Sequence, residues 1–251
     1  MQDTPVALVT GANQGIGLEI AKGLAASGFI VLVGSRDFTR GEVAAADVGQ
    51  TAVAVQLDVT DLLSITAAAE RISQEFGRLD VLVQNAAIAT TRDQIQAGEE
   101  LASAGRPSTA SLDEMRAVWE TNVFGVLAVY QAMVPILRDT PNARIVNVSS
   151  GMGSLTLNSD PDFPLRPLFD VNYAASKTAL NALTLAMAIE LEPYGINVNA
   201  VSPGFTRTRL TGFAGTDTPE EGAVEAVRVA VSGAAGPTGT FTHATMGVVP
   251  W

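Results

Sequence analysis

Short apolar segments alternate with helical segments along the whole chain, and this alternation constrains the fold most. Helix-strand alternation of this kind closes through right-handed crossovers into a parallel sheet covered on both faces. Strands are predicted over 5–10, 29–34, 51–57, 79–84, 143–149, 195–201 and 239–243. Helices are predicted over 15–27, 60–76, 112–138, 172–192 and 219–232. The sequence therefore predicts an α/β fold, a doubly wound parallel sheet formed by residues 1–251 as a single domain.

Composition excludes several classes of function. A net charge of −11 repels phosphate backbones and argues against nucleic-acid binding. The absence of cysteine and the single histidine, His243, leave few ways to build a zinc site, so we expect no metal. No uninterrupted apolar run approaches the ~20 residues of a membrane span, and the first residues lack the features of a signal peptide. We expect a cytoplasmic protein whose partner is a small molecule, without a membrane or nucleic-acid partner.

A glycine-rich turn joins the first predicted strand to the first predicted helix. It reads Thr10-Gly11-Ala12-Asn13-Gln14-Gly15-Ile16-Gly17. Glycine suits such a turn because the turn is tight, a pyrophosphate approaches its backbone, and the helix starts close to the strand. The helix N-terminus offers unpaired amides and a positive dipole end to phosphates. The turn predicts a dinucleotide site on a Rossmann-type sheet; the alternative is a plain strand–helix turn.

Tyr173 and Lys177 open the helix predicted over 172–192. They lie four positions apart, and therefore on one helix face. Tyrosine is normally too weak an acid to ionise near neutral pH, and a nearby ammonium lowers its pKa. Such a tyrosine can donate a proton to an alkoxide during reduction or accept one from an alcohol during oxidation. The pair predicts proton-transfer chemistry; the alternative is an exposed helix pair.

These motifs together resemble the short-chain dehydrogenase/reductase family, and the resemblance covers nearly the whole chain. It is carried by the Gly-x-x-x-Gly-x-Gly turn, Asn85-Ala-Ala, Thr121-Asn122, Asn147-Val-Ser-Ser150 and Tyr173-x-x-x-Lys177, all in the order of the family. The resemblance implies that Ser150 orients the substrate carbonyl and that Tyr173 is the general acid/base. It implies that Lys177 lowers the Tyr173 pKa and holds the nicotinamide ribose, and that Asn122 anchors a water in the proton relay. Ser150 is chosen over Ser149 because the family's serine falls three residues after the strand asparagine, here Asn147.

The resemblance also implies a set of cofactor-binding residues. Asp58 resembles the residue that holds the adenine; its alternative role is a helix-capping aspartate. Pro203-Gly204-x-x-x-Thr208 resembles the segment that fixes the nicotinamide and its carboxamide; the alternative is an ordinary Pro-Gly turn. The predicted set is Gly11, Asn13, Gln14, Gly15, Ile16, Gly17, Ser35, Arg36, Arg40, Asp58, Val59, Asn85, Ala86, Tyr173, Lys177, Pro203, Gly204, Thr206 and Thr208.

The end of the second predicted strand favours NADP(H) over NAD(H). An acidic residue there would bind the ribose 2′-hydroxyl of NAD, whereas an arginine would accept the 2′-phosphate of NADP. In the register of the family the selecting acid falls at position 35, which here is Ser35, and Arg36 and Arg40 follow. A shift of one residue would instead make Asp37 the ribose acid. Gln14 stands where many NADP-using relatives carry a basic residue.

Within the family the chain most resembles the carbonyl reductases, which reduce aldehydes, ketones and quinones. The insert between Ser150 and Tyr173 is longer than usual in the family. We hypothesise that its apolar side chains wall an apolar substrate pocket opposite a lid, and that deleting 155–168 changes substrate range without abolishing cofactor binding; the alternative is a packed surface loop. The insert side chains are Leu155, Leu157, Phe163, Leu165, Leu168 and Phe169, and the lid side chains are Phe205, Leu210 and Phe213.

Other interpretations stay open at this stage. The chain could be a cofactor-bound redox sensor without turnover, an NAD-dependent dehydrogenase working in the alcohol-oxidising direction, or an epimerase on the same fold. Ala87 stands where the family usually has glycine and is expected to crowd the cofactor. The helices over 112–138 and 172–192 commonly form the family's homodimer or homotetramer interface, which the insert could obstruct. The polar stretch 90–110 has no assigned role.

Overall fold

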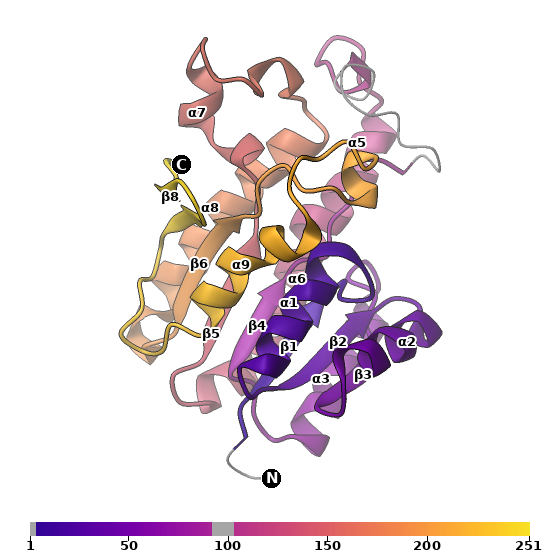
Figure 1. The fold of residues 1–251 in the computed structure, drawn as a ribbon, viewed down its shortest axis with the longest axis vertical. Coiled ribbons are helices and arrows are strands. Elements are labelled where there is room, and N and C mark those ends of the chain that lie inside the picture. The colour runs from indigo at the N-terminus through magenta and orange to yellow at the C-terminus, as the bar shows by residue number, and fades with distance from the viewer. Residues whose placement is uncertain (1–3, 92–102) are drawn as a thin grey trace.

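In the computed structural model, which describes residues 4–91 and 103–251, one eight-stranded sheet runs through the molecule (Figure 1). Its strand order is β3-β2-β1-β4-β5-β6-β7-β8, and every neighbouring pair is parallel except β7 and β8. The predicted doubly wound α/β fold is therefore confirmed. The strands are β1 (Val6–Thr10), β2 (Ile30–Ser35), β3 (Ala52–Gln56), β4 (Val81–Gln84), β5 (Arg144–Val148), β6 (Asn197–Ser202), β7 (Phe241–His243) and β8 (Gly247–Val248).

Helices cover both faces of the sheet. The longer ones are α1 (Gly15–Ala26), α2 (Phe38–Val48), α3 (Leu62–Glu75), α5 (Leu112–Trp119), α6 (Gly125–Asp139), α8 (Tyr173–Leu191) and α9 (Pro219–Ala230). Successive strand side chains point to opposite faces. In β1, Leu8 packs among the side chains of α3, α6 and α8, whereas Ala7 and Val9 pack among those of α1 and α9. Burial on both faces explains why the strands read as continuous apolar runs.

The structure differs from the predicted helices in two places, and each difference has a physical reason. The helix expected over 112–138 is divided into α5 and α6 by a π-helical segment, η1 (Glu120–Phe124). Helical periodicity does not distinguish one wider turn from an α-helix, so the pattern missed it. Helix α2 was not predicted either, because it is short and contains a glycine, Gly41; its N-cap is Asp37, whose Oδ1 accepts from the backbone N–H of Arg40 at 3.1 Å.

The helical stretch Leu112–Asp139 is, among the described residues, the only one with the length and hydropathy of a membrane span. Its α6 part buries Val129, Met133 and Leu137 completely against the sheet. That packing accounts for its apolar character, as in the core helices of globular proteins. Of the polar stretch 90–110, residues 92–102 lie outside the described residues.

The two segments that follow β5 and β6 are irregular, and both lie at the carboxyl edge of the sheet. After β5 come a short turn, η2 (Gly151–Gly153), then α7 (Leu155–Ser159) and η3 (Arg166–Leu168). After β6 comes a loop that contains η5 (Arg209–Thr211) and folds back so that Thr206 bridges Asp217. In open parallel sheets ligands bind at this edge, next to the point where the strand order reverses, here between β1 and β4.

Candidate active site

Two adjoining cavities lie at the carboxyl edge of the sheet. The first, which we call the inner cavity, has a volume of about 400 Å³ and lies between the insert 151–172 and the segment 202–217. The second, the glycine-loop groove, has a volume of about 730 Å³ and follows the ends of β1, β2 and β3. The two share Ile16, Asn85, Ala87, Thr208 and Leu210 in their linings, so they form one continuous site.

Three glycines give the glycine-rich turn its backbone shape and its close approach to neighbouring segments. Gly11 and Gly15 have φ angles of +64° and +58°, which favour glycine. A Cβ on Gly17 would lie 2.4 Å from Asn85 Nδ2 and 2.5 Å from the Gly11 carbonyl. The N-cap of α1, Gln14, makes no side-chain hydrogen bond to the first helical amides. These amides can therefore serve a phosphate, as the sequence predicted.

At the end of β2, the residues predicted to bind the ribose 2′-position are not all free to bind a ligand. Ser35 is 1% exposed, and its hydroxyl donates to the Asp37 carbonyl at 2.7 Å, so it is not free for a ribose. Asp37 caps α2 and pairs with Arg40 Nε at 3.6 Å. Arg36 is exposed, and Arg36 and Arg40 both line the groove. A cationic edge with one local carboxylate therefore stands where the 2′-position of a dinucleotide is expected.

Asp58 and Asn85 both line the glycine-loop groove, and each makes its own set of hydrogen bonds. Asp58 does not cap α3; that role belongs to Asp61, whose carboxylate accepts from the Leu63 N–H at 2.9 Å. Asp58 Oδ1 accepts from the backbone N–H and the hydroxyl of Thr60 at 2.9 and 2.7 Å. Asn85 Nδ2 donates to the Thr10 and Gly11 carbonyls at 3.0 and 3.2 Å, which ties β4 to the glycine-rich turn.

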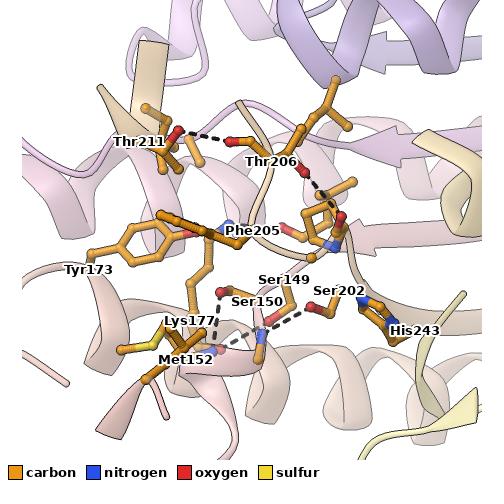
Figure 2. Close-up of a pocket in the computed structure, with 18 of the residues that line it drawn as sticks. Ser149, Ser150, Met152, Tyr173, Lys177, Ser202, Phe205, Thr206, Thr211 and His243 are labelled. Carbon is orange, nitrogen blue, oxygen red and sulfur yellow. Dashed lines mark hydrogen bonds between the residues drawn. The ribbon is translucent and has the colours of Figure 1, made fainter. Parts of the chain in front are cut away.

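Ser150, Tyr173 and Lys177 converge on the inner cavity from the end of β5 and the first turns of α8 (Figure 2). Lys177 is 3% exposed; its Nζ donates to the Val148 carbonyl at 2.8 Å and lies 5.7 Å from the centroid of the Tyr173 ring. Ser149, by contrast, is 1% exposed and its hydroxyl donates to Asn181 Oδ1 at 2.5 Å. Ser149 is thus committed to α8, and the hydroxyl that remains for a ligand is that of Ser150.

Burial dominates the ionisation of both helix residues. It raises the pKa of Tyr173 to about 12; a hydrogen bond with Ser150 opposes this rise, and the negative charge of Asp170 adds to it. Burial lowers the pKa of Lys177 to about 7. The sequence predicted that Lys177 would lower the Tyr173 pKa, but in this structure the pKa lies above its ordinary value because desolvation outweighs the hydrogen bond with Ser150. The phenol is therefore protonated at neutral pH.

Asn122 occupies η1 and is completely buried, and it lines neither cavity. Its Oδ1 accepts from the Ile88 N–H at 2.9 Å, and its Nδ2 donates to the Ile88 carbonyl at 2.8 Å and to Ser176 Oγ at 3.0 Å. These hydrogen bonds join Ile88, which lies beyond the end of β4, to Ser176 in α8. Because they use the side-chain amide of Asn122, a water bound by this residue would contact its backbone instead. Of the predicted catalytic and cofactor-binding residues, Asn122 alone lies outside the two linings.

The insert contributes part of the apolar wall that the sequence suggested. Leu157, Phe163, Leu165 and Leu168 line the inner cavity, together with Phe205 and Leu210 from the opposite segment. Three predicted members do not. Leu155 and Phe169 are 55% and 36% exposed and lie outside the lining, and Phe213 lines the glycine-loop groove instead. Short helical turns in the insert rotate alternate side chains outward, and apolar composition alone does not reveal that rotation.

The sequence interpretation missed three titratable groups in the inner cavity. Asp170 is 6% exposed, and its Oδ1 accepts from the Tyr173 and Ala174 N–H groups at the start of α8 at 2.7 and 3.0 Å; burial raises its pKa. Asp217 and His243 lie on the far side, near Gly204. Asp170 stands three residues before Tyr173, a cap spacing that could have been recognised. Asp217 and His243 carried no such signal, because only the folding of the segment after β6 brings them together.

The arrangement of sheet, glycine-rich turn and serine–tyrosine–lysine cluster defines a dinucleotide-dependent oxidoreductase. Comparison with known proteins gives the family: the model for short chain dehydrogenases matches residues 5–218. A short-chain dehydrogenase from Penicillium roqueforti is 35% identical over 240 residues, which cover 91% of this chain and 89% of the relative. The chain therefore belongs to the short-chain dehydrogenase/reductase family, whose members bind a nicotinamide cofactor.

Solved structures agree with this assignment. The structure of salutaridine reductase from Papaver somniferum is similar with a TM-score of 0.79 and 31% identity, covering 94% of this chain and 99% of that one. A 3-ketoacyl-(acyl-carrier-protein) reductase from Brucella melitensis, solved in complex with NADH, matches with a TM-score of 0.79 and 25% identity over 97% of this chain and 98% of that one.

Proposed function

We propose that this protein is an NADP(H)-dependent reductase that converts the carbonyl of an apolar aldehyde, ketone or quinone into an alcohol, with Tyr173 as the general acid. One observation carries the proposal. Ser150, Tyr173 and Lys177 line an inner cavity whose walls are largely apolar and which is continuous with the glycine-loop groove. A carbonyl in the cavity would thus meet a proton donor on one side and a cofactor in the groove on the other.

The residues present suit a nicotinamide dinucleotide. The uncapped amides at the start of α1 suit the pyrophosphate, and Gly17 allows this helix start to lie against Asn85 and the Gly11 carbonyl. Asp58 and Val59 would face the adenine, and Pro203, Gly204, Thr206 and Thr208 the nicotinamide. When bound, the reduced nicotinamide supplies a hydride to the carbonyl carbon.

The protein's own side chains would handle the oxygen and the proton. Ser150 donates a hydrogen bond to the carbonyl oxygen and so orients it. Tyr173 gives that oxygen its phenolic proton as the carbon becomes tetrahedral. A Tyr173 pKa of about 12 keeps the phenol protonated at neutral pH, so that it can donate its proton. Lys177, held by the Val148 carbonyl at 2.8 Å, has further N–H groups for a ribose hydroxyl, and its positive charge stabilises the phenolate that forms.

Arg36 and Arg40 support the choice of NADP(H). Both line the groove at the end of β2, and Arg36 is exposed with no ion pair among the described residues. A guanidinium matches the charge and geometry of a 2′-phosphate. Asp37 is engaged as the α2 cap and as the partner of Arg40, which makes it a poor ligand for the ribose of NAD.

The test is oxidation of NADPH and of NADH with a panel of aldehydes, ketones and quinones, using the wild-type enzyme and Tyr173→Phe. We expect turnover with NADPH, and a loss of about 10²- to 10⁴-fold in kcat for Tyr173→Phe with NADPH affinity retained. NADPH binding without turnover of any panel member would contradict the proposal and favour a redox sensor.

Arg36→Ala tests the cofactor choice separately. Losing a charge-assisted contact should raise the KM for NADPH by about ten- to a hundredfold and leave that for NADH within about twofold. Arg116→Ala is a control, since Arg116 is an exposed arginine of α5 that pairs with Asp113 and is not among the residues that line the groove. Equal losses with both cofactors would show that Arg36 does not read the phosphate.

A further inference from the structure

A donor and an acceptor of hydrogen bonds flank Gly204 at the far wall of the inner cavity. Asp217 and His243 both line this cavity. A Cβ on Gly204 would lie 2.5 Å from Asp217 Oδ2 and 3.1 Å from His243 Nε2, so both atoms border one small space. Figure 2 places His243 and Tyr173 at opposite sides of the view, with Ser150 and Ser202 between them. The pair therefore faces the end of the cavity remote from the proposed proton donor.

The hydrogen bonds of His243 determine which of its nitrogens carries the proton. Its Nδ1 accepts from the backbone N–H groups of Thr245 and Met246 at 3.2 and 3.4 Å. An Nδ1 that faces two donors must be unprotonated, so the proton of the neutral ring is on Nε2. Nε2–H has no hydrogen-bond acceptor among the described residues and is directed at the space beside Gly204.

The Asp217 carboxylate supplies the acceptor. Its Oδ1 accepts from the Thr216 hydroxyl at 3.1 Å, while Oδ2 accepts no hydrogen bond and the carboxylate forms no ion pair within the described parts of the chain. The backbone holds the residue in place, because Asp217 N–H donates to the Phe205 carbonyl at 3.0 Å and Arg207 N–H donates to the Asp217 carbonyl at 2.8 Å. Asp170, the other carboxylate in the cavity, is engaged by the amides of α8.

Gly204 keeps the space between the two groups open. Its φ of +80° lies in the region that favours glycine, and any Cβ there would collide with Asp217 Oδ2. A ligand atom in the inner cavity that contacts both Asp217 Oδ2 and His243 Nε2 must donate to the carboxylate and accept from the imidazole N–H. A hydroxyl does both; an ammonium cannot accept, and a carboxylate cannot donate.

We propose that Asp217 and His243 form a recognition site for a hydroxyl group, so that the preferred substrate is an apolar carbonyl compound with a hydroxyl at its far end. This inference rests on the proposed reductase function and narrows its substrate class. A substrate that ends in a methyl group would leave both polar groups unpaired, and sites of this kind reject such analogues strongly.

The test compares ketones of nearly equal shape with NADPH as the cofactor. The probes are the meta and para isomers of hydroxymethyl-acetophenone and of ethyl-acetophenone, which replace a terminal OH by CH3 at two reaches. We expect the wild-type kcat/KM to favour the hydroxyl member of at least one pair by about tenfold or more. Asp217→Leu and His243→Phe should each bring that ratio close to one, with the kcat/KM for the ethyl ketone retained.

Controls and outcomes are separable. Asp113→Leu, an exposed aspartate on α5, should leave the ratio unchanged. The two variants lie in different segments, so misfolding of one leaves the other informative. An unchanged ratio in both variants overturns the proposal. So does a raised KM for NADPH at an unchanged ratio, which would assign the pair to the cofactor's carboxamide.

Failure of the proposed function has a different signature. If neither ketone of any pair is reduced, calorimetric binding of the same ketones to the NADPH complex of Tyr173→Phe still measures the hydroxyl preference. A preference that is present there and lost in Asp217→Leu supports the recognition site without the reductase. No preference in either assay rejects the site.

Discussion

The glycine-loop groove and the inner cavity lie side by side, yet they are built in different ways. The groove is formed where β1, β2 and β3 run into the following helices through short connections, such as 11–14 and 36–37. The inner cavity is formed by two long segments, 151–172 and 203–218, which contain only short helical turns. In the proposed function the groove would hold the nicotinamide cofactor common to the family, whereas the cavity would determine which substrate this chain accepts.

Contacts with residues far away in the sequence hold the insert that forms one wall of the inner cavity. The insert is fastened to the C-terminus: Ser154 Oγ donates to the Pro250 carbonyl at 2.6 Å, and Thr156 N–H donates to the Trp251 carbonyl at 3.1 Å. Trp251 in turn stacks on Phe241 of β7 with ring centroids 5.6 Å apart. Residues almost a hundred positions away thus fix the shape of the cavity wall, whereas the backbone turns of the groove are specified by neighbouring residues and tied to β4 by Asn85.

The largest expected difference between the two regions concerns the affinity for NADPH after one methyl group is added to a glycine of each region. Gly17→Ala places a Cβ against Asn85 Nδ2 and the Gly11 carbonyl, and overpacking of this kind costs about 1–3 kcal/mol. We expect the affinity for NADPH, measured by fluorescence titration, to fall by about tenfold to a hundredfold.

Gly151→Ala is the matched change on the cavity side, where the nearest atom to a new Cβ is Ser202 Oγ at 3.9 Å. It should leave the affinity for NADPH within about twofold of wild type. Similar losses in the two variants would contradict the view that the groove tolerates side chains less than the cavity does.

The groove could largely be predicted from the sequence because local signals specify it. The glycine spacing, the apolar run of each strand and the polar ends of the strands all act over a few residues. Every predicted cofactor residue accordingly lines one of the two cavities. Ser35 shows the limit: its position was predicted, but its engagement with the Asp37 carbonyl depends on the turn into α2, a helix that the pattern did not reveal.

The cavity could be predicted only in outline. Apolar residues in the insert indicated a wall, yet Leu155 and Phe169 point away from it. The meeting of Asp217 with His243 across Gly204 depends on how β7 pairs with β6 and how the loop after β6 folds back. The role predicted for Asn122, anchoring a water in the proton relay, stays a prediction, and the sequence did not reveal that the π-helical turn places its side chain between Ile88 and Ser176. These side-chain orientations and contacts depend on tertiary packing, which a sequence pattern does not reveal.

A smaller effect is expected from thinning the cavity wall. The double variant Leu165→Ala/Leu168→Ala removes two lining side chains and should raise the KM for apolar ketones by about tenfold, since contacts to each lost methyl and methylene group contribute to binding. The KM for NADPH should stay unchanged. Leu155→Ala is the matched control, because Leu155 is exposed and outside the lining. If the control raises the ketone KM equally, the insert acts through general stability rather than as a wall.

The smallest expected effect concerns Lys177, which lines the inner cavity, and it appears in stability rather than in binding. Burial lowers its pKa to about 7 in the folded chain, whereas an unfolded lysine titrates near 10.4. Between these values the unfolded chain binds more protons, so this group makes stability rise as the pH rises.

Lys177→Met removes that dependence of stability on pH. Without cofactor, the variant should melt at least about 3 °C above wild type at pH 7, with the difference narrowing by pH 9.5. Lys22→Met is the control: Lys22 pairs with Glu19 and Asp47, which raise its pKa, so its difference from wild type should not change over this range. A Lys177→Met difference that is constant with pH would mean that the buried ammonium is not the cause.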